Sequence, residues 1–125
     1  MRNRDIPDIK YGDYYALVIG INEYKSLPKL NTAVPDSQTV AKMLEDLYGY
    51  NVTLLTNASR ETIIDAFDDL RDKLSEDDNL LIYYAGHGWL DQQTGSGYWL
   101  PVNAKPDRRS RWFSNATLTE ALQGL

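Results

Sequence analysis

The stretch that decides the fold is Leu80-Leu81-Ile82-Tyr83-Tyr84-Ala85-Gly86-His87-Gly88. Its apolar run stops at two glycines, which flank the only histidine of the chain. A short continuous apolar run predicts a buried strand of a parallel sheet. In open α/β sheets, ligands bind outside the carboxyl ends of the strands, so His87 is expected where such folds carry their chemistry. Imidazole transfers protons near neutral pH, and glycines let a substrate approach main-chain N–H groups closely.

Length and composition restrict the class of protein. The chain has 125 residues and 42% hydrophobic content, which fits one domain with its own core. The net charge of -5 argues against binding to nucleic acid or to anionic membranes. No apolar run is long enough to span a membrane and no signal-peptide pattern follows Met1, so we expect a cytoplasmic protein. The absence of cysteine excludes disulfides, thiolate metal sites and a thiol nucleophile within this sequence.

Strands and helices are expected to alternate after a polar lead-in at residues 1–13. This order is typical of an α/β layered fold with a mostly parallel sheet. The last helix should cross over to a further parallel strand, which this sequence lacks, and the open edge would invite self-association. The predicted elements are strands at 14–21, 52–55 and 80–85, a helix from Pro35 that ends at Gly49, a helix capped by Ser59, a hairpin of 89–90 with 98–102, and a last helix opened by the capping box Thr117-x-x-Glu120.

Other catalytic and binding motifs are missing from the sequence. Neither of the glycine-rich phosphate-binding patterns occurs, and one histidine cannot build a histidine-rich metal site. Gly95-Ser96-Gly97 does not form the G-x-S-x-G pattern of a serine nucleophile. The acidic residues between 65 and 72 are typical of a solvated helix face and lack the spacing of a calcium loop. His87 alone would also suit a hydrogen-bonded structural role, so the flanking pattern carries the functional hypothesis.

The ordered motifs resemble the caspase-like cysteine peptidases, the group of caspases, metacaspases and prokaryotic relatives. The most specific match is Tyr84-Ala85-Gly86-His87-Gly88, which looks like the strand and turn that deliver the catalytic histidine. The resemblance runs from about Tyr14 onward and implies the large-subunit part of a caspase-like three-layer α/β sandwich, with a mostly parallel sheet and its C-terminal part missing. Weaker matches occur in the family's order at Ala16–Tyr24, Leu27–Ser37 and Tyr98–Ala104.

The resemblance implies a cysteine endopeptidase that uses a Cys–His dyad. By this resemblance His87 is the general acid and base, Gly88 offers its backbone N–H to the oxyanion, and Asp36 binds a basic side chain before the scissile bond. Pro35 stands where the family often has Asn, and Asp36 also suits a first-turn acid favoured by the helix dipole. The expected partner is a protein or peptide substrate. No cofactor is implied, although calcium dependence in some metacaspases leaves a weak calcium site open.

The nucleophile itself is missing. In the family the cysteine follows a further strand, so the resemblance implies that residues 14–125 are a partial peptidase domain. Its partners would be the remaining C-terminal part of the domain or a second copy, and the chain alone should not hydrolyse peptides. Two alternatives stay open. One is a non-catalytic caspase-like module that binds a partner, and the other is a receiver-like or flavodoxin-like domain, whose acidic pocket or phosphate loop is not evident.

Overall fold

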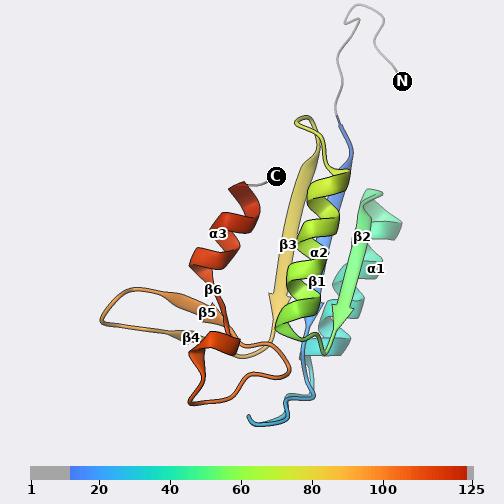
Figure 1. The fold of residues 1–125 in the computed structure, drawn as a ribbon. Helices are drawn as coiled ribbons and strands as arrows, with labels where there is room; N and C mark the ends of the chain where they lie inside the picture. Colours follow the sequence, from blue (N-terminus) through green and yellow to red (C-terminus); the bar gives the residue numbers. More distant parts are fainter. Residues whose placement is uncertain (1–11, 124–125) are drawn as a thin grey trace, which may run out of the picture.

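A computed structural model describes residues 12–123 (Figure 1). The lead-in expected at residues 1–13 therefore lies almost wholly outside the described residues, and this domain boundary stays a prediction. The elements are β1 (Tyr14–Gly20), α1 (Ala33–Tyr48), β2 (Asn51–Thr56), α2 (Arg60–Lys73), β3 (Asn79–Ala85), β4 (Gly88–Leu90), β5 (Gly97–Trp99), a 3₁₀ turn (Arg109–Arg111), β6 (Phe113–Ser114) and α3 (Asn115–Gln123).

The main sheet is parallel and has the strand order β2-β1-β3. The chain leaves the central strand β1 through α1 to reach β2, and it returns through α2 to β3 on the other side. Because these two crossovers run in opposite directions, right-handed connections place α1 and α2 on opposite faces of the sheet. Figure 1 shows α2 in front of the strands and α1 behind them. The predicted three-layer α/β sandwich is thus confirmed.

Strand β1 is buried on both faces, which explains its continuous apolar sequence. Ala16 and Val18 pack toward α1 around Ala41. Leu17 and Ile19 point to the other face, and burial of each such side chain contributes about 1.5–3 kcal/mol. The side chains of α2 that cover this second face are Ile63, Ala66, Phe67 and Leu70.

Two helix ends lie where the sequence predicts them. The Ser59 Oγ accepts a hydrogen bond from the Thr62 N–H at 3.2 Å and so caps α2. Gly49 ends α1 in the left-handed conformation, with φ of 69°, and its N–H donates to the Glu45 carbonyl. A glycine adopts this conformation without the cost of a Cβ atom, so both signals act locally and can be recognised in sequence.

The start of α3 corrects the sequence analysis. The capping box predicted at Thr117 is wrong, because α3 begins at Asn115 and Thr117 lies inside its first turn. The Ser114 Oγ accepts the Thr117 N–H at 3.1 Å instead. Ser114 and Thr117 both carry a hydroxyl. Ser114 ends strand β6 and precedes the helix, so its hydroxyl is the one that can accept the N–H three residues later.

The start of α1 also differs from the prediction. The helix begins at Ala33, two residues before Pro35, and its N-cap Thr32 makes no side-chain capping bond. The Asn22 Oδ1, from the segment after β1, accepts the Val34 N–H at 3.2 Å in its place. This cap comes from a residue distant in sequence, so no local motif announces it.

A second sheet of order β4-β5-β6 lies at the end to which the parallel strands point (Figure 1). The predicted hairpin is confirmed, since Trp89 pairs with Tyr98 across β4 and β5. Strand β6 has two residues and was not predicted, because so short an element has no measurable periodicity. No helix among residues 12–123 is both long and apolar enough to cross a membrane.

We predict that Gly20→Ala destabilises the fold by about 1–3 kcal/mol through overpacking. A Cβ at Gly20 would lie 2.2 Å from the Oγ of Ser37 and 2.7 Å from the Ala33 carbonyl oxygen. Ser37 is fully buried, so it has no room to withdraw. Urea unfolding measures the loss. The matched control is Gly97→Ala, where a Cβ would have no neighbour within 4 Å, and equal midpoints for the two variants would contradict the prediction.

We also predict that the chain self-associates through an edge of its main sheet. Within the described residues β2 and β3 are the edge strands, and Leu54 and Leu81 on them are 37% and 41% exposed. Unpaired edges with exposed apolar residues recruit further strands, and a lysine there opposes pairing. Light scattering should show a mass that rises with concentration and that falls in Leu81→Lys but not in Leu47→Lys on α1. A monomer with a sharp, reversible thermal transition would argue against association.

Candidate active site

The candidate site lies at the carboxyl ends of β1 and β3. His87 follows β3, and the segment that follows β1 carries Tyr24 and Pro28. The chain leaves β1 toward β2, away from β3, and a crevice at such a point is where open α/β sheets bind ligands. The pairing of the two strands continues beyond their ends, because the Ile21 N–H donates to the Ala85 carbonyl at 3.0 Å. Segments far apart in sequence thus meet at His87.

The imidazole of His87 is held by the β1–α1 segment. Its Nε2 lies 2.7 Å from the Pro28 carbonyl oxygen, and the Tyr24 ring packs against it with centroids 4.6 Å apart. A carbonyl oxygen only accepts hydrogen bonds, so Nε2 must carry the proton. In the neutral ring the lone pair then resides on Nδ1, which makes no hydrogen bond to residues 12–123. The half-buried ring is therefore fixed with its basic nitrogen available.

The backbone N–H of Gly88 points away from the hairpin. Gly88 is opposite Trp99, and the neighbouring Leu100 N–H donates to the His87 carbonyl at 3.0 Å. This bond identifies Gly88 and Trp99 as a non-hydrogen-bonded antiparallel pair, whose own N–H groups face outward. Strand β4 is an edge of its sheet, and Gly88 is exposed. The residue after His87 thus offers an N–H that β5 does not use.

The third predicted site residue, Asp36, belongs to α1. It is exposed in the first turn of α1, where its backbone N–H donates to the Thr32 carbonyl at 2.9 Å. Among the described residues its carboxylate makes neither a hydrogen bond nor an ion pair. The structure thus brings His87 and Gly88 together as neighbours, whereas Asp36 has the setting of a first-turn acid. Its role in binding substrate stays a prediction.

Two tyrosines complete the site, and the sequence analysis missed both. The Tyr24 hydroxyl accepts the His87 N–H at 2.8 Å, and the Tyr84 hydroxyl donates to the His87 carbonyl at 2.7 Å. Burial raises the pKa of both phenols, so both stay neutral. Tyr84 lies within an apolar run, so its sequence context predicts a strand residue and gives its hydroxyl no role. The one signal in the sequence was the glycine at position 86. In the structure, a Cβ there would lie 2.6 Å and 2.7 Å from the hydroxyl oxygens of Tyr84 and Tyr24.

An aromatic groove opens beside Gly88. Trp99 stacks on Tyr84, with the two rings 4.6 Å apart and nearly parallel. The groove has a volume of about 420 Å³ and is mainly apolar. It runs between the antiparallel sheet and the start of α3. It is lined by residues 88–90 of β4, residues 97–99 of β5, and Phe113, Ser114, Asn115 and Leu118.

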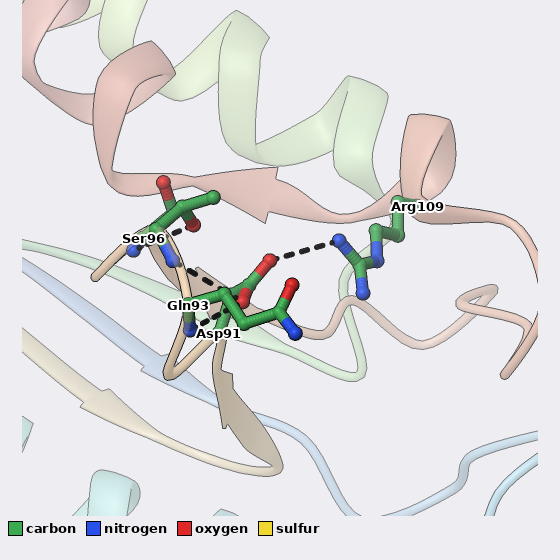
Figure 2. Close-up of polar contacts among 5 residues, drawn as sticks. Asp91, Gln93, Ser96 and Arg109 are labelled. Carbon is green, nitrogen blue, oxygen red and sulfur yellow. Dashed lines mark hydrogen bonds and ion pairs between the residues drawn. The ribbon is translucent and has the colours of Figure 1, made fainter.

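The hairpin that carries Gly88 is fixed at its tip by Asp91 (Figure 2). Its Oδ1 accepts the Gln93 N–H at 3.0 Å, and its Oδ2 lies 3.2 Å from Nη1 of Arg109. The Gln93 N–H is the main reason that the pKa of Asp91 lies below its usual range. The Arg109 guanidinium also stacks 4.3 Å from the Trp89 ring. The exposed loop before β6 is thereby tied to the hairpin.

Metal ligands do not gather in the described part of the chain. No group of three or more His, Cys, Asp or Glu side chains within residues 12–123 could hold an ion. The acidic residues between 65 and 72 lie on α2 as expected for a helix face, and Arg71 pairs with Asp68 at 2.9 Å. Calcium dependence stays a prediction without a ligand set.

Comparisons with known proteins show the family of the chain. The chain is 31% identical over 98 residues to mucosa-associated lymphoid tissue lymphoma translocation protein 1 of Homo sapiens, which covers 78% of this chain and 12% of that protein. It is 31% identical over 88 residues to metacaspase-1 of Eremothecium gossypii, covering 62% of this chain and 20% of that protein. The chain thus spans a fifth or less of the length of these relatives.

A solved structure and a family profile complete the comparison. Protein GSU0716 from Geobacter sulfurreducens superposes with a TM-score of 0.74 at 21% identity, covering 90% of this chain and 46% of that one, which shows a shared fold. The profile of the Caspase domain, Peptidase_C14, matches residues 13–125. With its parallel sheet, its Gly-His-Gly turn and this match over most of its length, the chain belongs to the caspase domain family.

Proposed function

We propose that this chain supplies the histidine half of a Cys–His endopeptidase site. The observation that carries the proposal is the bond between Nε2 of His87 and the Pro28 carbonyl, which leaves Nδ1 as the proton acceptor. A general base needs a fixed orientation and an available lone pair, and His87 has both. The thiol would come from residues beyond this sequence, which contains no cysteine.

The chemistry follows from the two ring nitrogens. Nδ1 would take the thiol proton, and the thiolate would attack the peptide carbonyl to form a tetrahedral intermediate. The imidazolium keeps its Nε2–H bond to the Pro28 oxygen, whose partial negative charge stabilises the new positive charge. Nδ1–H would then give the proton to the leaving amine as the C–N bond breaks, which leaves a thioester. Water, with His87 taking its proton, would attack the thioester and release the acid, and the proton would return to the thiolate.

Gly88 would stabilise the oxyanion. Its N–H follows His87 directly and faces the free edge of β4, so it can meet the oxygen of a carbonyl under attack near Nδ1. A preorganised N–H donor is worth most where negative charge develops. The bonds of Asp91 at the tip of the hairpin would help to keep this donor in place.

The proposed substrate is a peptide with a basic residue before the scissile bond. The resemblance assigns this preference to Asp36, whose carboxylate is exposed and makes no ion pair with other described residues. Asp36 lies in the first turn of α1, the helix that follows the segment with Pro28, and its carboxylate could receive an Arg or Lys side chain.

A second candidate function is a non-catalytic module that binds a protein partner. The specific observation in its favour is the mainly apolar groove of about 420 Å³ beside β4, β5 and α3, which could receive apolar side chains of a partner. The two functions differ in the residue that follows the next strand beyond this sequence. A cysteine after an apolar strand, with an acid just before it, favours the peptidase, whereas serine, glycine or tyrosine there favours the binding module.

We predict that His87→Ala lowers kcat/KM by about 10²–10⁴-fold in an extended chain that includes the cysteine segment. Hydrolysis of an Arg-terminated reporter peptide measures the loss. The control is Gln93→Ala, an exposed side chain at the hairpin tip, which should keep full activity.

The 125-residue chain itself should be inactive in the same assay, because it has no thiol. Cleavage by this chain alone would overturn the dyad, and wild-type rates in the extended His87→Ala variant would remove His87 from the mechanism.

We predict that Asp36→Asn in the extended chain lowers kcat/KM for Arg reporters by about tenfold or more, which is about 1.4 kcal/mol of binding. The neutral amide no longer pairs with the substrate guanidinium. The matched control is Glu61→Gln, another exposed first-turn acid, on α2. If both variants lose activity equally, the effect is one of helix stability, and Asp36 does not bind substrate.

A further inference from the structure

The backbone of His87 is enclosed by a ring of hydrogen bonds from two tyrosines. The Tyr24 hydroxyl lies 2.8 Å from the His87 N–H, and the Tyr84 hydroxyl lies 2.7 Å from the His87 carbonyl oxygen. The two hydroxyl oxygens lie 3.4 Å from each other. One residue thus has both of its peptide groups bound by one pair of side chains. Tyr24 comes from the segment after β1, and Tyr84 comes from β3.

The proton positions follow from counting donors. A backbone N–H can only donate, so the Tyr24 oxygen accepts from His87. The single proton of Tyr84 goes to the nearer carbonyl, that of His87, while the Leu100 oxygen lies farther away at 3.2 Å. The Tyr24 proton then points to the Tyr84 oxygen. The bonds run in one direction, from the His87 N–H through both hydroxyls to the His87 carbonyl.

Packing holds both phenols in this arrangement. Tyr24 is 1% exposed, and its ring contacts the imidazole. The Tyr84 ring is stacked on Trp99. A Cβ at Gly86 would lie 2.6 Å from the Tyr84 hydroxyl and 2.7 Å from the Tyr24 hydroxyl, so a larger residue there would have to displace them. Hydrogen bonds in sequence polarise one another, so such a ring is strongest when it is complete.

We propose that Tyr24 and Tyr84 are a pair of positioning residues for His87. They fix the peptide groups on both sides of its Cα, and thereby direct the imidazole to the Pro28 carbonyl and the Gly88 N–H to the free edge of β4. Neither tyrosine transfers a proton itself. The purpose of this arrangement rests on the proposed function of His87, but the positioning is a property of the chain itself and can be measured without catalysis.

The test uses the single histidine of the chain. Protein labelled with ¹⁵N, including the histidine ring, gives one pair of ring nitrogen signals, whose positions report the tautomer. The wild-type signals should be those of the Nε2–H form. In Tyr24→Phe and in Tyr84→Phe we expect the signals to move toward the mixed tautomers of free imidazole. Exchange of the His87 amide proton with solvent should be about tenfold faster or more, because the hydrogen-bonded ring that protects it is opened.

The matched control is Tyr83→Phe, the same substitution one residue earlier on β3, where the side chain packs on the opposite face of the sheet. It should leave the ring signals of His87 unchanged. The ring needs both hydroxyls, so loss of either one opens it. The double variant Tyr24→Phe with Tyr84→Phe should therefore shift the signals little more than each single variant does.

Two results would overturn the proposal. One is an unchanged tautomer in both single variants while their amide spectra show a folded protein. The other is an equal shift in Tyr83→Phe, which would indicate general loosening. Failure of the peptidase proposal gives a different pattern, in which the tyrosine variants alter the His87 signals but the extended chain cleaves no peptide.

Discussion

The parallel pairing of β1 with β3 determines the candidate site. It continues past both strand ends through the Ile21–Ala85 hydrogen bond, so the two following segments leave the sheet side by side. That register places Pro28 and Tyr24 against a residue 59 and 63 positions away in sequence. A slip of one residue would exchange the faces of β3 and carry Tyr84 and His87 away from Tyr24. The contacts of His87 therefore depend on the pairing of β1 with β3.

Burial of β1 between α1 and α2 secures this pairing. Its side chains alternate between two hydrophobic clusters, so neither face can be exposed without loss of core. The tyrosine hydroxyls lie near the same core, and a buried hydroxyl without a partner costs about 1–3 kcal/mol. The His87 peptide supplies these partners. Stability and site geometry are thus coupled, because the bonds that satisfy the buried phenols are also those that orient the histidine.

A feature of the fold could be predicted from the sequence where neighbouring residues determine it, and not where distant residues do. The apolar runs of β1 and β3, the cap at Ser59 and the end of α1 at Gly49 follow from neighbouring residues, and the structure confirms them. The Gly-His-Gly turn was located correctly at a strand end for the same reason. Caps supplied from a distance were not predicted, as with Asn22 on α1.

The contacts of His87 were missed because they use groups that carry no sequence signal. Any residue at position 28 has a carbonyl, so the partner of Nε2 cannot be recognised from residue type. Tyr84 resembles an ordinary member of an apolar run, and its hydroxyl gains meaning only when β1 brings Tyr24 within 3.4 Å. Strand β6, at two residues, is too short to show a pattern.

The organisation of His87 is complete without any thiol. Its ring and its peptide groups are held by residues of the same two strand ends and the hairpin that follows, and β5 leaves the Gly88 N–H unused. Here one nitrogen is bound and the other is left to accept a proton. In the proposed dyad this asymmetry would suit a base, because preorganised groups need not rearrange during the reaction.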